Sequence, residues 1–111
     1  MPKSDVPGLP LTDVSILDVG CGGGIMAEGF ARLGANVTAI DANSELIDVA
    51  NQRKDRYKLD NLQYLDLLIE DLQDIDKRFD VVISSEVIEH VDEPWAFAAY
   101  CSNLVKPGKS V

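Results

Sequence analysis

The sequence predicts an α/β fold, a doubly wound parallel sheet with helices on both faces. Short β-branched apolar segments alternate with segments of helical spacing along the 111 residues. Such alternation is typical of parallel strands joined by right-handed crossovers. The first apolar segment also runs directly into Gly20-Cys21-Gly22-Gly23-Gly24, which we expect to be a tight turn that leads into a helix. The strand order should be 3-2-1-4, with the sequence stopping near the start of a fifth strand.

The expected elements alternate in order after an irregular, proline-containing lead-in at residues 1–13. Apolar runs that end in turn residues predict strands at 14–19, 36–40, 62–65 and 80–84. Helical spacing predicts helices at 26–33, at 44–57 and from 92–94 to 104. Gly34 should end the first helix in the left-handed conformation, Ser44-Glu45 should cap the second, and Pro107-Gly108 should end the third.

Composition and charge restrict the class of protein. Hydrophobic residues make up 46% and charged residues 26% of the sequence, as in a single globular domain. The net charge of −9 argues against a nucleic acid or an anionic lipid surface as the main partner, since either would repel the protein. Cys21 and Cys101 lack the spacing of paired metal ligands, which favours a reduced intracellular setting. The N-terminus has no signal-peptide apolar core, and we expect no apolar run that spans a bilayer.

The glycine-rich turn is the principal candidate for a binding site. In a doubly wound sheet the ligand lies beyond the carboxyl ends of the strands, where Asp18, Gly20, Asp41 and Ser85 are expected. Glycines let the backbone approach a ligand closely, and a carboxylate at Asp41 can bind both hydroxyls of a ribose. The alternative is that the glycines only form a turn and that Asp41 only caps a helix. The joint placement of these residues favours a binding site.

The spacing of the glycines separates two kinds of cofactor. A dinucleotide-binding turn needs a glycine five places after its first, and here that place is Ile25. The pattern present, Asp18-x-Gly20-x-Gly22-x-Gly24, resembles the first motif of the S-adenosylmethionine-dependent methyltransferases. Their fold is Rossmann-like. The resemblance extends from Ile16 to Gly108, and it makes a nicotinamide oxidoreductase the weakest alternative.

The methyltransferase resemblance implies roles for individual residues. An acid at the Asp18 position helps to hold the amino group of the cofactor, Asp41 resembles the ribose-binding acid, and Leu68-Ile69-Glu70 resembles the segment beside adenine. Phe79-Asp80-Val81-Val82 resembles the fourth-strand motif that leads to the methyl-transfer site. Cys21 lacks a nearby histidine in sequence, so we interpret it as a small packing residue of the turn and not as a nucleophile. The predicted cofactor-binding residues are Asp18, Gly20, Cys21, Gly22, Asp41, Ala42, Leu68, Ile69 and Ser85.

Three segments are similar to the ubiquinone-biosynthesis O-methyltransferases: residues 17–24, 31–35 and 85–91. This resemblance implies a phenolic or catechol hydroxyl on a polyprenylated ring as the methyl acceptor. It also implies the matrix side of the inner mitochondrial membrane in a eukaryote or the cytoplasm in a bacterium, with peripheral membrane or biosynthetic-complex association of the full-length protein. The alternatives are another small-molecule or protein methyltransferase of this fold and a non-catalytic S-adenosylmethionine-binding module.

Glu86, Glu89 and His90 form a candidate metal site after the fourth strand. Their i, i+3, i+4 spacing places them on one face of a helical turn. Two carboxylates and an imidazole suit Mg²⁺, Mn²⁺ or Zn²⁺, and such an ion would lower the pKa of a catechol hydroxyl and orient its oxygen. The resemblance to the ubiquinone enzymes also implies a divalent ion. Two alternatives remain: His90 is a general base without a metal, or the segment is a solvated helix start.

The predicted domain, residues 1–111, is incomplete relative to the family that it resembles. Ser110-Val111 looks like the start of a fifth strand, whereas three strands follow the fourth in that family. We therefore expect a free edge on the fourth strand, self-association of this piece, and no turnover by the piece alone.

Overall fold

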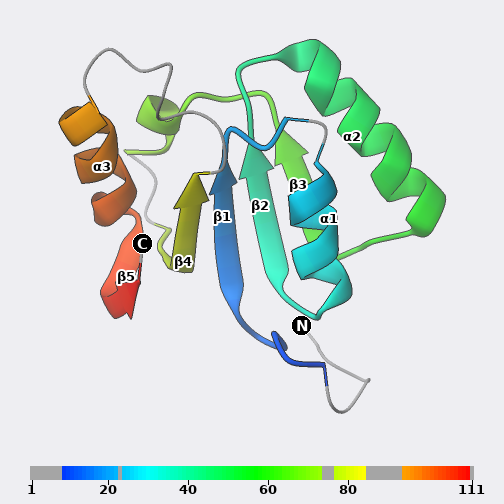
Figure 1. Ribbon diagram of the computed structural model, residues 1–111, viewed down its shortest axis with the longest axis horizontal. Helices are drawn as coiled ribbons and strands as arrows, with labels where there is room; N and C mark the ends of the chain where they lie inside the picture. Colours follow the sequence, from blue (N-terminus) through cyan, green and yellow to red (C-terminus); the bar gives the residue numbers. More distant parts are fainter. Residues whose placement is uncertain (1–8, 23, 74–76, 85–93, 111) are drawn as a thin grey trace.

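A computed structural model of the chain describes residues 9–22, 24–73, 77–84 and 94–110. Its centre is a sheet of five parallel strands in the order β3-β2-β1-β4-β5, which confirms the predicted fold class and the order of the first four strands (Figure 1). The strands are β1 (Ser15–Val19), β2 (Asn36–Ile40), β3 (Leu62–Leu65), β4 (Phe79–Ser84) and β5 (Val105–Ser110). The helices are α1 (Ile25–Arg32), α2 (Ser44–Tyr57), the short 3₁₀ helix η1 (Ile69–Leu72) and α3 (Pro94–Asn103).

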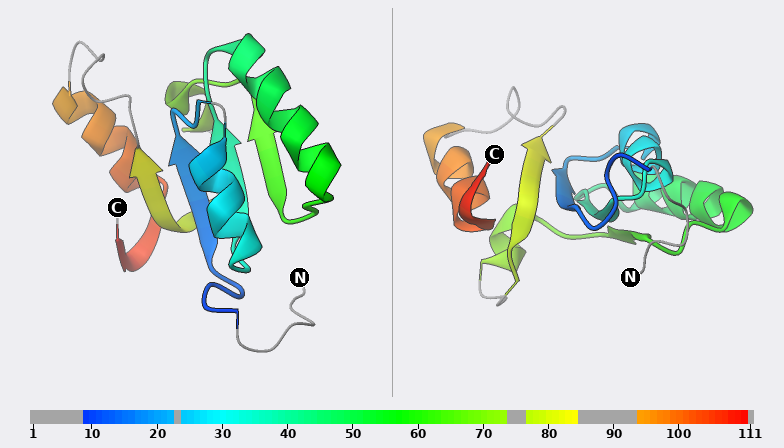
Figure 2. Two further views of the ribbon diagram at one scale, coloured as in Figure 1. Left: turned by 45° about the vertical axis from the view of Figure 1, so that its right-hand side comes forward. Right: turned by 90° about the horizontal axis from the view of Figure 1, so that it is seen from below.

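The helices cover the sheet from both sides, as the two views of Figure 2 show. On one face, Ala27 and Ala31 of α1 and Ala50 of α2 pack with Ile16 of β1. On the other face, Cys101 of α3 joins a second cluster with residues of η1 and β4. No helix in the described part of the chain is long and apolar enough to cross a membrane.

The central strand β1 is buried on both faces, which explains its nearly continuous apolar sequence. Ile16 belongs to the cluster beneath α1 and α2, whereas Leu17 and Val19 belong to the cluster beneath α3 and η1. This alternation follows from the two-residue period of a strand. Asp18 therefore points to the α1 side, and it is fully buried.

The ends of the first two helices show how local sequence directs the chain. Gly34 has φ of 104° and follows α1, as predicted, and the Ala35 N–H donates to the Phe30 carbonyl at 3.2 Å. The predicted cap of α2 was wrong by one residue. The N-cap is Asn43, whose side-chain oxygen accepts the Glu45 N–H at 3.0 Å and the Leu46 N–H at 3.2 Å. An asparagine side chain reaches the free N–H groups of a first turn as readily as serine does.

The end of the chain differs from the prediction. Helix α3 ends at Asn103, one residue before the predicted Leu104, and β5 begins at Val105, so Pro107-Gly108 lies within a strand and does not end the helix. Because β5 pairs with β4, the predicted free edge on the fourth strand was wrong. Proline is tolerated here because β5 lies at an edge of the sheet, and the register shifts between Phe79 and Val81.

Asp80, at the amino end of β4, links this strand to β1 and β5 through side-chain contacts. Its Oδ2 accepts the Ser15 N–H at 2.9 Å and the Ser15 hydroxyl at 3.1 Å, and its Oδ1 lies 3.3 Å from the Lys106 Nζ. The Ser15 N–H is the main reason why the pKa of Asp80 is lowered below its usual value. Asp80 thus lies at the opposite end of the sheet from the predicted ligand site, and its interactions are structural.

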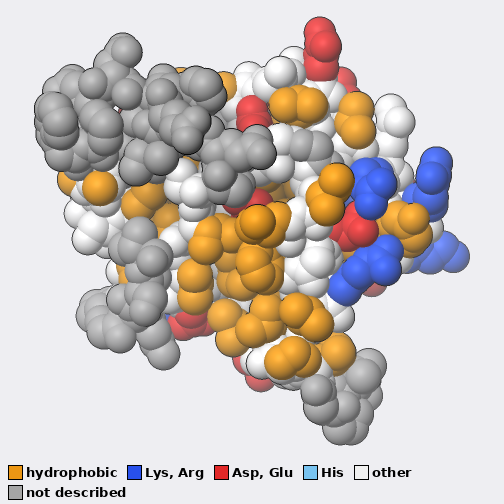
Figure 3. Space-filling view, in the orientation of Figure 1, with side chains coloured by type: hydrophobic (Ala, Val, Ile, Leu, Met, Phe, Trp, Pro, Cys, Tyr) orange, Lys and Arg blue, Asp and Glu red, His pale blue; other side chains and the backbone are white. Residues whose placement is uncertain are grey.

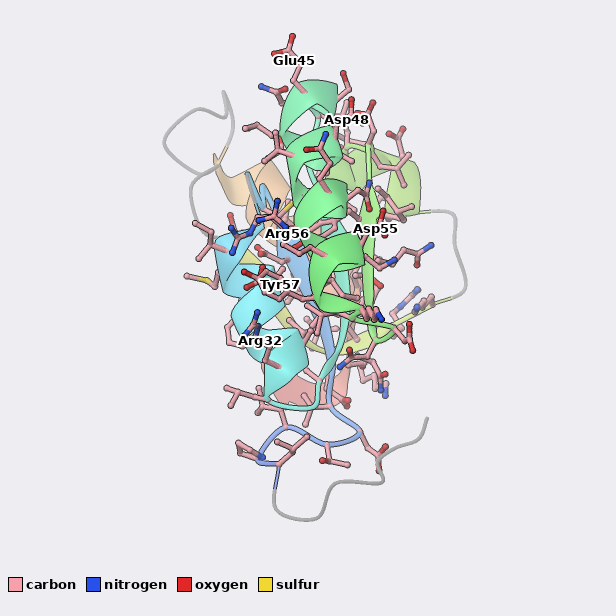
Figure 4. The ribbon with its side chains drawn as sticks, turned by 90° about the vertical axis from the view of Figure 1, so that its right-hand side faces the viewer. Arg32, Glu45, Asp48, Asp55, Arg56 and Tyr57 are labelled. Atoms are coloured by element: carbon pink, nitrogen blue, oxygen red, sulfur yellow. The ribbon has the colours of Figure 1, made fainter. Side chains whose placement is uncertain are left out.

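The outer surface of α1 and α2 combines apolar and basic side chains. Ile25 is 73% exposed and Met26 52% exposed, and Figure 3 shows hydrophobic side chains gathered over α1. Between the helices, the buried Glu28 carboxylate receives two hydrogen bonds from the Arg53 guanidinium, at 3.1 and 3.2 Å. Arg32 lies 4.4 Å from the ring centre of Tyr57, and Figure 4 shows the two side by side. These contacts join α1 to α2 on one face of the sheet.

Candidate functional site

The predicted cofactor residues of the first three strands meet at one edge of the sheet. Gly20 follows β1, Asp41 follows β2, and Leu68 follows β3 after two connecting residues. Since the strands are parallel, their carboxyl ends lie together at the upper edge in Figure 1. Ser85, which follows β4, lies outside the described residues. The topology therefore places the described candidates where a doubly wound sheet binds its ligand.

The glycine turn is held against the end of β2 by its own backbone. The N–H groups of Gly20 and Cys21 both donate to the Ile40 carbonyl, at 2.9 and 3.1 Å. Gly20 and Gly22 have φ of 74° and 57°, values that residues with a β-carbon rarely adopt. A β-carbon on Gly22 would have no neighbour within 4 Å, so the turn presents bare backbone to open space at this point. A ligand can approach the backbone closely there.

Asp41 connects the turn to the following helix. Its Oδ2 accepts the Gly22 N–H at 2.9 Å, and its Oδ1 accepts the Asn43 N–H at 2.8 Å. The carboxylate is half-buried, and each of its oxygens has a second lone pair available to a hydroxyl. Asp41 therefore links the glycine turn to the start of α2. Its role as the ribose-binding acid stays a prediction from the sequence. Ala42, the next predicted residue, is exposed beside it.

Beneath the turn, the buried acid Asp18 lies close enough to Cys21 to affect its ionisation. Burial, together with the nearby charges of Asp18 and Asp41, raises the pKa of the Cys21 thiol to about 12. The thiol is thus protonated at neutral pH and 8% exposed, which makes it a poor nucleophile. The interpretation of Cys21 as a packing residue agrees with its place in the core cluster under α1.

The third strand contributes Tyr64, which the sequence pattern predicts only as part of a strand. Its hydroxyl donates to the Gly24 carbonyl at 2.9 Å, and the side chain is 7% exposed. The available signal was a polar aromatic residue between Gln63 and Leu65 in a short predicted strand. That signal does not name the partner, which lies 40 positions away in the sequence.

The predicted adenine segment forms the start of η1. Leu68 is 49% exposed, whereas Ile69 is buried in the cluster beneath α3. The Asp71 carboxylate accepts the Leu68 N–H at 2.9 Å and so fixes the backbone of this segment. Leu68 presents an apolar surface to the solvent, and Ile69 anchors the segment from below.

The predicted metal ligands Glu86, Glu89 and His90 lie outside the described residues. Among the residues that the structure does describe, no group of three His, Cys, Asp or Glu side chains is arranged to hold a metal ion. The metal site therefore stays a prediction from the sequence.

Comparisons with known proteins agree with this geometry. A parallel sheet with a glycine turn at the end of β1 and an acid at the end of β2 defines a Rossmann-like cofactor-binding domain. The family model described as "Methyltransferase domain" matches residues 17–111, and the chain belongs to this family. It is an S-adenosylmethionine-dependent methyltransferase domain.

Individual relatives and solved structures are consistent with that family. The chain is 43% identical over 100 residues to a ubiquinone biosynthesis O-methyltransferase of Cereibacter sphaeroides, covering 90% of this chain and 40% of the relative. It is 42% identical over 113 residues to a mitochondrial ubiquinone biosynthesis O-methyltransferase of Dictyostelium discoideum, covering 93% and 35%. The structure of PKMT2 from Rickettsia typhi in complex with AdoHcy superposes with a TM-score of 0.79 at 22% identity, covering 87% of this chain and 20% of that one, which shows the fold. The chain thus spans about 40% of the length of the curated relatives that it matches.

Proposed function

We propose that the full-length protein transfers a methyl group from S-adenosylmethionine to a phenolic or catechol hydroxyl of a polyprenylated ubiquinone precursor. The geometry that carries the cofactor part of this proposal is the contact between Gly22 and the Asp41 carboxylate at the carboxyl ends of β1 and β2. The 42–43% identity to ubiquinone biosynthesis O-methyltransferases of a bacterium and of a mitochondrion supports the acceptor class.

The residues present fit the cofactor. The open backbone at Gly22 suits its methionine part, Asp41 suits the ribose hydroxyls, and the exposed Leu68 suits one face of adenine. Asp18, buried below the turn, is the acid that the family resemblance assigns to the amino group. When bound, S-adenosylmethionine supplies an electrophilic methyl group on a sulfonium leaving group. The chain contributes positioning, because a reaction between two oriented partners needs no enzyme nucleophile.

The reaction balances without a redox partner. The acceptor oxygen bonds to the methyl carbon, the carbon–sulfur bond breaks, and its electrons remain on sulfur. The hydroxyl proton leaves to a base, and if no metal ion is bound His90 is the candidate for this base in the sequence.

An acceptor assay with labelled S-adenosylmethionine on the full-length protein tests the proposal. A polyprenylated dihydroxybenzoate should accept the methyl group, whereas the matching compound with both hydroxyls methylated should not. A lysine-containing peptide and an amine in parallel reactions would detect a protein or N-methyltransferase of this fold. Cofactor binding without turnover on any acceptor would favour a non-catalytic binding module and would contradict the proposal.

We further propose that Glu86, Glu89 and His90 bind a divalent ion such as Mg²⁺, Mn²⁺ or Zn²⁺. The support is their helical spacing in the sequence and the oxygen and nitrogen donors that such ions accept. A bound ion would lower the pKa of the acceptor hydroxyl. If no ion is needed, His90 acting as a general base explains the same segment.

The expected cellular location of the full-length protein follows from the acceptor class. A polyprenylated substrate resides in a membrane, so we propose peripheral association of the full-length protein with a membrane or with other biosynthetic enzymes. The corresponding location is the matrix side of the inner mitochondrial membrane in a eukaryote and the cytoplasm in a bacterium. Fractionation of cells that express the tagged full-length protein tests this, and recovery in a secreted fraction would contradict it.

A further inference from the structure

We propose that Tyr64 is a positioning residue for the cofactor, because its hydroxyl holds the Gly24 carbonyl and thereby sets the shape of the glycine turn. This inference rests on the proposed cofactor site and extends it to a third strand. Tyr64 does not touch the cofactor in this proposal; it acts through the backbone of the turn.

The hydrogen bond between Tyr64 and Gly24 is a buried link between β3 and the start of α1. The Tyr64 hydroxyl donates to the Gly24 carbonyl at 2.9 Å, and the Glu28 N–H donates to the same oxygen at 2.9 Å. Both lone pairs of this carbonyl are therefore occupied. The helix supplies one donor and β3 supplies the other, so the direction of the carbonyl is determined from two sides.

The ring of Tyr64 also determines which residue can stand at position 24. Gly24 has φ of 86°, and a β-carbon added there would lie 2.7 Å from the Tyr64 Cζ and would overlap its hydroxyl. Non-bonded carbon atoms do not approach so closely, so the Tyr64 ring leaves no room for a β-carbon at position 24. Contact and conformation thus both require glycine at this point.

The turn transmits this restraint to the residues that face the ligand. The Gly24 N–H donates to the Cys21 carbonyl at 3.0 Å and closes the turn, while Asp41 holds the Gly22 N–H at 2.9 Å. The backbone at residues 20–22 is therefore supported by β2 at one end and by Tyr64 at the other. A turn that is held in its binding shape loses less conformational freedom when the cofactor binds.

The surroundings keep Tyr64 in its donating form. Burial, with smaller contributions from the nearby acids Glu28 and Asp18, raises the pKa of the Tyr64 hydroxyl above its usual value. The hydroxyl thus stays protonated throughout the range in which the protein would work. A phenylalanine at position 64 keeps the ring and removes only this donor.

Calorimetric titration of the full-length protein with S-adenosylhomocysteine, with urea unfolding of each variant in parallel, tests the proposal. Tyr64→Phe should weaken binding by about threefold to tenfold, the size expected for one buried hydrogen bond. The other two tyrosines provide matched controls. Tyr57→Phe removes an exposed hydroxyl on α2, and Tyr100→Phe removes one beside the second core cluster, so neither should change the dissociation constant.

Two outcomes would contradict the inference or the proposed function on which it rests. If the parent protein does not bind S-adenosylhomocysteine, the proposed cofactor site fails. If the parent binds and Tyr64→Phe binds equally well, with or without lowered stability, Tyr64 has only a structural role and the inference is overturned. To keep the variant folded, we would repeat the titration in a Gly29→Ala background. Gly29 is exposed on α1, a β-carbon there would have no neighbour within 4 Å, and alanine favours a helix.

Discussion

Replacing Asp41 with alanine removes the carboxylate that joins the glycine turn to the start of α2. Two backbone donors lose their acceptor: the Gly22 N–H at 2.9 Å and the Asn43 N–H at 2.8 Å. A hydrogen bond to a charged group contributes about 1.5–3 kcal/mol when buried, and less when water can replace it. Since the Asn43 bond is exposed and the Gly22 bond is half-buried, we expect the free energy of unfolding to fall by about 1–2 kcal/mol.

The effect on the cofactor should be larger than the effect on stability. The alanine variant lacks the acceptor for the ribose hydroxyls and also leaves the turn less restrained. We expect S-adenosylhomocysteine to bind about 1–3 kcal/mol more weakly, which is about 5- to 150-fold in the dissociation constant. Asp41→Asn keeps one oxygen acceptor and should fall between the parent and the alanine variant.

Calorimetry measures these affinities, and Asp48→Ala is the matched control. Asp48 is an exposed acid near the amino end of α2, and its removal changes the net charge by the same amount (Figure 4). Its variant should bind as the parent does. Equal affinity of the Asp41→Ala variant and the parent would remove Asp41 from the site, and an equal loss in both variants would attribute the effect to net charge alone.

Three further predictions concern pH and metal dependence. Between pH 9 and 12 folded Cys21 keeps a proton that the unfolded chain loses, so urea unfolding should show stability falling as pH rises, and Cys21→Ala should reduce that fall. The lowered pKa of Asp80 stabilises the fold above pH 3.8, and this contribution is lost as the pH falls below it. Asp80→Asn should thus destabilise by about 1–2 kcal/mol and leave cofactor affinity unchanged. A divalent ion should raise turnover of the full-length protein, and Glu86→Ala or His90→Ala should abolish the increase. Full activity after EDTA treatment would refute the metal site. A pH–rate profile would then test His90 as the base.

Periodicity predicted most of the fold because the strands are short and mostly apolar and because α1 and α2 each bury one apolar face. The bounds of β2 and β3 are those predicted, and so is the order of the first four strands. The end of the chain was predicted less well. Pro107-Gly108 is a strong local stop signal, yet pairing of β5 with β4 outweighs it at the sheet edge.

The candidate site shows the same division between local pattern and spatial contact. Gly20, Gly22 and Asp41 were identified from the sequence because their spacing reflects the turn after a strand and the acid after the next one. Asp80, which belongs to a motif associated with methyl transfer, lies at the other end of the sheet, where Ser15 and Lys106 bind it. The motif covers the amino half of β4, and because the strands are parallel the ligand site lies at their carboxyl ends, away from Asp80.

The sequence by itself determined the α/β class and the residues of the glycine turn, because these depend on periodicity and on the conformations that glycine allows. Only the tertiary structure showed that Asp41 holds the turn and that Tyr64 supports it from β3. Those contacts join residues that are 19 and 40 positions apart. They arise from the packing of neighbouring parallel strands, and no local pattern in the chain specifies which side chains this packing brings together.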